Sequence, residues 1–116
     1  PAAPRVAEST VDSVRLVTDL ARLADDSMRG RLSGTPENAR ARDYVAARFD
    51  ALGLATVGAG RVLPFTFTAT GGAPVQGANV AGLVRGTVHP DRYIVVTAHF
   101  DHVGVRQPVA GDSIYN

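Results

Sequence analysis

The sequence contains no cysteine, no lysine and no tryptophan, and all 12 of its basic residues are arginine. Without cysteine there is no disulfide, no thiolate nucleophile and no thiolate ligand, so any metal must be held by histidine and carboxylates. No apolar run approaches the ~18 residues that a membrane span needs. Pro1–Thr10 also lacks the charged and apolar regions of a signal peptide. We therefore expect no membrane partner.

The sequence also lacks a strong net charge. Twelve basic and 11 acidic residues leave a net charge of +1, which gives no field that would attract nucleic acid. A hydrophobic content of 45% is typical of globular proteins and is too high for a disordered chain. With 116 residues, the chain is one folded domain at most.

The first quarter of the sequence predicts a flexible arm over residues 1–9 and then a helix. Ser9 or Thr10 is a suitable N-cap, and Asp12 follows Ser9 at the spacing of a capping box. Apolar residues recur at three-residue steps, and charged residues fall on the opposite side: the first set is Val11, Val14, Val17, Leu20 and Leu23, and the second is Asp12, Arg15, Asp19 and Arg22. We expect the apolar stripe to pack and the charged face to be solvated.

A second helix is predicted at about 36–52. Asp25 and Asp26 are expected to end the first helix, and a connector reaches Gly34. Thr35 then offers an N-cap before Pro36, and Gly53 supplies the left-handed residue that often ends a helix. The expected apolar stripe consists of Ala41, Val45, Phe49 and Leu52, with Tyr44 beside it.

The period then changes to two, which is typical of strands. Leu63–Ala69 alternates apolar and polar residues, and Pro64 within it favours an edge strand. Residues 71–74 are predicted to form a turn, Asn79–Val84 a second short strand, and residues 85–92 a connector in which His89 is a solvated turn residue.

Tyr93–Ala98 is an almost unbroken apolar and β-branched run, which favours a central strand buried on both faces. Two helices followed by three strands of this kind predict a layered α/β architecture.

Polar residues follow this run at once, in His99-Phe100-Asp101-His102. Ligands of open α/β sheets bind beyond the carboxyl ends of strands, so this position favours a functional site. In extended chain, His99 and Asp101 point the same way, and a carboxylate could fix which imidazole nitrogen faces a metal. His-x-Asp alone is a weak motif, and the pair could equally be a satisfied strand-end histidine and a turn-forming aspartate.

The segment Ile94–Gly104 resembles the first metal-binding strand of the di-zinc aminopeptidases of the bacterial leucyl aminopeptidase and aminopeptidase Y type. Other matches lie in order on both sides: Gly30-Arg31, Gly34-Thr35, the Tyr44 helix with Gly53-Leu54, Asn79-Val80 with Gly82 and Gly86, and Gly111–Asn116. The resemblance covers roughly residues 14–116, the N-terminal part of such a domain. Its specific parts are the His99 block and the final six residues.

The resemblance implies a three-layer α/β/α fold with a mixed sheet. It gives His99 the role of a zinc ligand and Asp101 that of the residue that orients it. His102 lies where the family varies and is expected at the rim of the site. The bridging Asp and the other ligands, with the Glu that acts as general base, are expected downstream of Asn116. Asp112 and Ser113 are expected to shape the loop that leads there.

The implied activity is release of N-terminal residues from peptides by a water that two zinc ions activate, in a secreted or periplasmic protein. Residues 1–116 alone are expected to hold no zinc firmly and to be inactive. Self-association, or a complementary C-terminal chain, is expected to complete the sheet. Two alternatives remain: a non-catalytic binding or ectodomain homologue, and another enzyme on the same scaffold, such as a carboxypeptidase or a glutaminyl cyclase.

Overall fold

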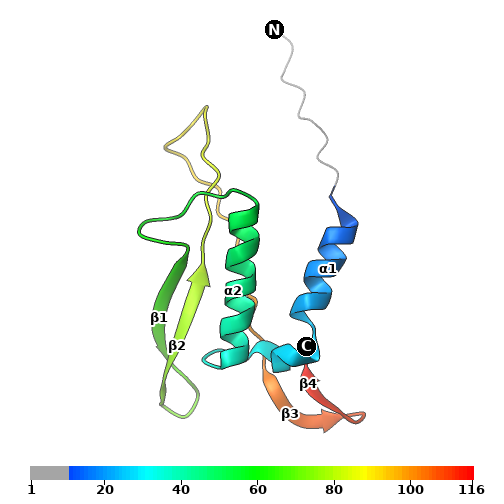
Figure 1. Cartoon of the computed structure of the whole chain (residues 1–116). Coiled ribbons are helices and arrows are strands. Elements are labelled where there is room, and N and C mark those ends of the chain that lie inside the picture. The colour runs from blue at the N-terminus through cyan, green and yellow to red at the C-terminus, as the bar shows by residue number, and fades with distance from the viewer. Residues whose placement is uncertain (1–10) are drawn as a thin grey trace.

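The structure, a computed structural model, describes residues 11–116. Its elements in chain order are helix α1 (Ser13–Leu23), the 3-10 helix η1 (Asp26–Arg31), helix α2 (Pro36–Ala51), and strands β1 (Val62–Thr68), β2 (Pro74–Val80), β3 (Gly104–Val109) and β4 (Asp112–Tyr115). In Figure 1 the β1–β2 hairpin and α1 stand on opposite sides of α2, and the β3–β4 hairpin lies near η1. The predicted arm over residues 1–9 and the N-cap at Ser9 or Thr10 lie outside the described residues.

Helix α1 forms, but two predictions about it are wrong. It begins at Ser13, because the carboxylate of Asp12 is the N-cap and accepts a hydrogen bond from the backbone N–H of Arg15 at 3.0 Å. Its apolar stripe is also exposed: no residue of α1 is buried, and Val17 and Leu20 are 63% and 58% exposed. The charged side makes the contact with α2 instead.

Helix α2 forms where the sequence predicts it, because the residues that start and end it act through their near neighbours in the chain. The hydroxyl of Thr35 accepts from the backbone N–H of Asn38 at 3.2 Å, and Pro36 occupies the first turn. Gly53, with φ of 69°, follows the last turn. Of the predicted stripe, Ala41 is fully buried and Leu52 is 57% exposed.

In the β1–β2 hairpin, the first strand forms where the sequence predicts it, and the second strand lies earlier in the chain than predicted. The antiparallel register pairs Val62 with Val80 and Thr68 with Pro74. The predicted glycine turn closes the hairpin, with φ of 105° at Gly71 and 85° at Gly72. Because this turn places Pro74 directly opposite Thr68, β2 begins five residues before the predicted start at Asn79 and ends at Val80.

The predicted central strand Tyr93–Ala98 is wrong for the described residues, which show no strand there. Its side chains from Tyr93 to Val96 are 75%, 96%, 78% and 91% exposed. A strand buried on both faces needs a neighbour on each edge, and no strand within residues 11–116 lies beside this run. An unpredicted hairpin follows it, in which β3 and β4 join through Ala110 and Gly111 at φ of 53° and 90°.

The helices and antiparallel strands together give mixed α and β character. The strands form two separate two-stranded sheets. Among residues 11–116, the buried apolar side chains are Met28 of η1 and Ala41 of α2, at 1% and 0% exposure, so the core lies where these two elements meet. None of the helices described is long and apolar enough to cross a lipid bilayer.

Candidate functional site

His99 and Asp101 lie together, as the sequence predicts. The Nδ1 atom of His99 is 3.3 Å from Oδ1 of Asp101 and 3.0 Å from the backbone carbonyl oxygen of the same residue. The imidazole is 81% exposed and the carboxylate 45% exposed. The ring is therefore held on one side only, with its other side open.

The contacts of Nδ1 decide which nitrogen of neutral His99 carries the proton. A carboxylate and a carbonyl oxygen can only accept hydrogen bonds, so Nδ1 is the donor. The lone pair of the neutral ring then belongs to Nε2. This is the tautomer in which the outer nitrogen of a histidine can bind a metal while a carboxylate supports the inner one.

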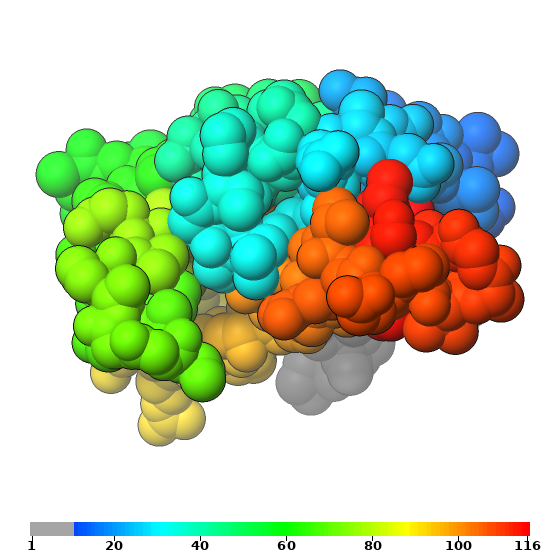
Figure 2. All heavy atoms as spheres, turned by 90° about the horizontal axis from the view of Figure 1, so that it is seen from below, coloured from blue at the N-terminus to red at the C-terminus, as the bar shows by residue number. Residues whose placement is uncertain are grey.

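A segment from the start of the chain runs beside the His99 block. Arg31 donates from Nε to the carbonyl oxygen of Phe100 at 2.9 Å, and the backbone N–H of His102 donates to the carbonyl oxygen of Arg31 at 3.2 Å. Leu32 and His102 form a parallel bridge. Figure 2 shows the atoms of this early segment against those of residues near 100.

This pairing brings in Ser33, which the sequence analysis missed. The hydroxyl of Ser33 donates to Oδ2 of Asp101 at 2.7 Å, while Oδ1 of the same carboxylate faces His99. Ser33 and Asp101 are 68 residues apart, so no local pattern could join them. The only available signal was the resemblance of Gly30-Arg31 and Gly34-Thr35, which flank Ser33.

Gly30 explains why the early segment can approach so closely. A Cβ atom on Gly30, whose φ is 65°, would lie 2.5 Å from the carbonyl oxygens of both Gly104 and Tyr115. Its neighbours Arg29 and Arg31 also have positive φ, at 45° and 47°. Three successive left-handed residues are costly and persist only where surrounding contacts hold them. Here they direct the chain from η1 toward Asp101.

Ser33, Asp101 and His99 are the residue types of a hydrolytic triad, but their order excludes that chemistry. In a triad the imidazole accepts the proton of the hydroxyl, and the carboxylate supports the imidazole. Here the hydroxyl of Ser33 donates to the carboxylate, and none of the hydrogen bonds within residues 11–116 joins Ser33 to His99. No imidazole is placed to activate Ser33 as a nucleophile.

The other histidines are not brought to this pair by any side-chain contact in the described region. His102 is exposed and takes part through its backbone only. His89 is exposed in a turn, where its carbonyl oxygen accepts from Arg92 at 3.1 Å, which confirms the prediction of a solvated turn residue. Residues 11–116 hold no group of three or more histidines and carboxylates able to bind a metal ion.

The acidic residues near the ends of the elements have structural partners. Asp25 does not end α1: it is the N-cap of η1 and accepts from the backbone N–H of Ser27 at 2.9 Å. Asp112 accepts from the backbone N–H of Ile114 at 2.9 Å and so shapes the β4 strand. The side-chain amide of Asn116 donates to Asp26 at 2.9 Å.

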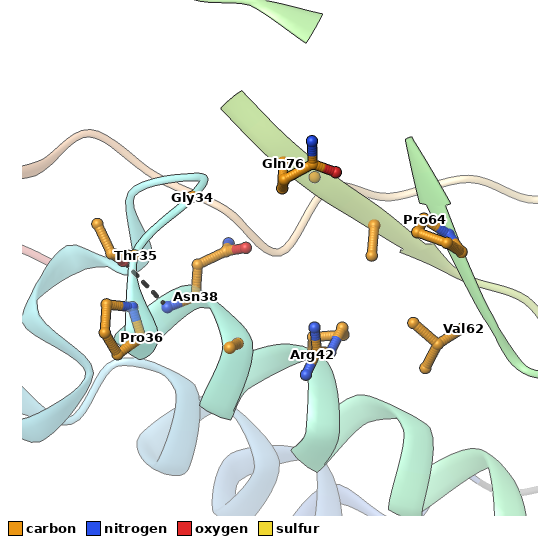
Figure 3. A pocket seen from close by; sticks show the side chains of 11 residues that line it. Gly34, Thr35, Pro36, Asn38, Arg42, Val62, Pro64 and Gln76 are labelled. Atoms are coloured by element: carbon orange, nitrogen blue, oxygen red, sulfur yellow. Dashed lines mark hydrogen bonds between the residues drawn. The ribbon is translucent and has the colours of Figure 1, made fainter. Parts of the chain in front are cut away.

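A surface pocket lies elsewhere, between the start of α2 and the β1–β2 hairpin (Figure 3). Its lining is Gly34, Thr35, Pro36, Asn38, Ala39, Arg42, Val62, Pro64, Gln76, Gly77 and Ala78. Asn38 is held by the carbonyl oxygen of Arg31, and Arg42 pairs with Asp43. Neither His99 nor Asp101 lines the pocket, so we do not assign it to the site.

The chain was compared with protein-family models, curated proteins and solved structures, and none of the three comparisons found a match.

Proposed function

We propose that this chain carries the first metal-binding segment of a zinc-dependent aminopeptidase with a three-layer α/β/α fold, of the secreted or periplasmic type. The observation that carries the proposal is the orientation of His99. Its Nδ1 atom donates to the backbone carbonyl oxygen of Asp101 at 3.0 Å and lies 3.3 Å from the carboxylate of the same residue, which leaves Nε2 with the exposed lone pair.

Among residues 11–116, His99 is suited to be one protein ligand of a metal centre. His99 would bind through Nε2, and Asp101 would hold the ring and make it a stronger ligand. In the complete site, two zinc ions would supply a bound water of lowered pKa and polarise the scissile carbonyl of a peptide. A zinc site needs three or four protein ligands. The other ligands and the general base would come from residues outside 1–116.

The exposure of Tyr93–Ala98 supports the same proposal. Four successive apolar side chains that are 75% or more exposed are costly in water. A larger sheet would cover this run on both faces and give it two neighbouring strands, as the run's composition favours. The loop that carries His99 would then stand at the carboxyl end of a central strand, where sites of open α/β sheets lie.

The test uses the whole product of the gene that encodes this chain. We expect it to release N-terminal residues from aminoacyl-4-nitroanilides and peptides, and to contain close to two zinc ions per chain by mass spectrometry of metals. His99→Ala should lose at least a hundredfold in kcat/KM with loss of zinc, and His89→Ala, at an exposed turn, should match the wild type.

Wild-type turnover by His99→Ala in zinc-replete buffer would overturn the assignment. A folded, zinc-free and inactive wild-type protein would instead favour the non-catalytic homologue. Release of C-terminal residues, or cyclisation of N-terminal glutamine, would identify another enzyme on the same scaffold.

A further inference from the structure

The two oxygens of the Asp101 carboxylate have different partners. Oδ2 accepts the hydroxyl proton of Ser33 at 2.7 Å, and Oδ1 lies 3.3 Å from Nδ1 of His99. A carboxylate is planar, so a hydrogen bond that fixes one oxygen also fixes the direction of the other. The Asp101 side chain is 45% exposed and would otherwise be free to turn toward water.

The backbone holds Ser33 more firmly than it holds His99. Ser33 follows Leu32, which bridges His102, and Arg31, which donates to the carbonyl oxygen of Phe100. The carbonyl oxygen of Arg31 also accepts from the side-chain amide of the buried Asn38 at 3.0 Å. His99 itself is 81% exposed, and its contacts within the described region are those with Asp101.

We propose that Ser33 is a positioning residue for His99. Its hydroxyl holds the Asp101 side chain, and Asp101 selects the tautomer of His99 that is protonated on Nδ1, because its backbone carbonyl oxygen accepts from Nδ1 at 3.0 Å and its carboxylate lies 3.3 Å from the same atom. Nε2 is thereby presented as the ligand atom. The tautomer does not depend on any metal. The consequence for zinc rests on the proposed function, because it requires that His99 bind the ion.

The opposite tautomer is the natural alternative. A free imidazole in water carries its proton mainly on Nε2, and that form would turn an N–H rather than a lone pair toward a metal. An exposed ring such as that of His99 therefore needs a fixed acceptor at Nδ1 to hold the other form. Ser33 holds the side chain of Asp101, the residue that supplies this acceptor.

The first experiment reads the tautomer directly in the 116-residue chain, without metal. Nitrogen-15 NMR spectra of the histidine rings are recorded at about pH 8.5, two units above the ordinary pKa of ~6.5 for histidine in a model peptide. The wild type should show His99 protonated mainly on Nδ1. Ser33→Ala should shift the population several-fold toward the Nε2 form, and Ser33→Thr, which keeps the hydroxyl, should restore the wild-type spectrum.

His89 and His102 serve as internal controls, because Ser33 forms no hydrogen bond with either side chain within the described residues. Their spectra should not change in Ser33→Ala. A wild-type His99 that is mainly protonated on Nε2 would overturn the proposal without any variant. The proposal would also be overturned if the tautomer of His99 were unchanged in Ser33→Ala, or if the spectra of all three histidines changed equally.

The second experiment measures zinc affinity in the whole gene product. Ser33→Ala should weaken zinc binding by roughly three- to tenfold, less than the ~10- to 100-fold typical of losing a carboxylate that supports a ligand histidine. The two proposals can fail separately. If Ser33→Ala shifts the tautomer but neither the wild type nor any variant binds zinc, the proposed function is rejected and the role of Ser33 stands. If the protein binds zinc but Ser33→Ala leaves the tautomer unchanged, the role of Ser33 is rejected and the proposed function stands.

Discussion

The hydroxyl of Tyr44 on α2 donates a hydrogen bond to the carboxylate of Asp19 on α1. Nε of Arg48, one turn further along α2, lies 3.0 Å from the same carboxylate. These contacts connect α1 to α2 through its charged side. The apolar side of α1 faces solvent, which is the reverse of the arrangement that the amphipathic pattern predicts.

The contact between Tyr44 and Asp19 makes the docking of α1 depend on pH at both ends of the scale. The hydrogen bond from Tyr44 is the largest cause that lowers the pKa of Asp19 below its ordinary 3.8; partial burial opposes it and the charge of Arg48 adds to it. The same hydrogen bond is the largest cause that raises the pKa of Tyr44 above its ordinary 10.0. The contribution of Asp19 to the stability of the fold is thus complete above pH 3.8, and it is lost as the pH falls through the lowered pKa of Asp19. That of Tyr44 is complete below 10.0 and is lost as the pH rises through its raised pKa.

We therefore predict that Tyr44→Phe lowers the thermal midpoint at pH 7 and removes the part of the stability that Tyr44 is expected to lose as the pH rises through its raised pKa. Melting curves at pH 3, 7 and 10.5 test this, together with an absorbance titration of the tyrosines in the wild type and the variant. Tyr93→Phe is the control, because Tyr93 is 75% exposed. Equal effects of the two substitutions would show that Tyr44 does not tether α1.

Gly30→Ala should destabilise the chain through a backbone clash. The added Cβ would lie 2.5 Å from the carbonyl oxygens of Gly104 and Tyr115, at a φ of 65°. Gly58→Ala is a matched control, because its φ is 63° but nothing lies within 4 Å of the added atom. Left-handed strain alone costs about 1–2 kcal/mol. Gly30→Ala should exceed Gly58→Ala by about 1–3 kcal/mol in urea unfolding, the usual cost of overpacking. Equal costs would mean that η1 moves away from β3 and β4 freely.

Arg61→Met should cost about 1–3 kcal/mol, because the buried guanidinium loses hydrogen bonds to three acceptors and each such bond is worth about 0.5–1.5 kcal/mol. The side chain of Arg61 is 8% exposed, and it donates to Asp50 at 2.6 Å and to the carbonyl oxygens of Ala81, at 3.1 Å, and Leu54. It thus joins the end of α2 to the start of β1 and the end of β2. Arg42→Met, which removes a pair with the exposed Asp43, should cost under ~1 kcal/mol. Comparable urea midpoints for both variants would contradict this role of Arg61.

The parts of the fold that the sequence predicted correctly are those set by neighbours in the chain. Thr35 and Pro36 start α2, Gly53 ends it, and Gly71 with Gly72 turns the first hairpin, each through contacts within a few residues. The sequence analysis placed the start of α1 too early, because it took Asp12 as the capping-box partner of Ser9, whereas Asp12 is itself the N-cap. An N-cap at Ser9 and an N-cap at Asp12 both fit the same pattern of residues.

The errors concern contacts between distant residues. The apolar run Tyr93–Ala98 has the composition of a central strand, but composition alone does not supply the neighbouring strands that make one. The contact between His99 and Asp101 could be predicted because the two residues are two positions apart. The bond from Ser33 to Asp101 could not, because it depends on how the turn around Gly30 directs the chain.

The exposed run Tyr93–Val96 leads to the last prediction, that the 116-residue chain associates with itself at micromolar concentration. Its four side chains are 75–96% exposed and carry no charge. An extended apolar run of this kind can pair with the same run of a second copy, which would supply the missing edge.

Val96→Lys should then shift the chain toward monomer, since a lysine opposes edge-to-edge pairing. Val88→Lys is the matched control, because Val88 is 80% exposed but lies outside the run. Val17→Lys tests the alternative contact through the exposed stripe of α1. Sedimentation velocity over a hundredfold range of concentration separates these outcomes: a wild-type chain that stays monomeric throughout would contradict self-association, and dissociation by Val17→Lys alone would move the contact to α1.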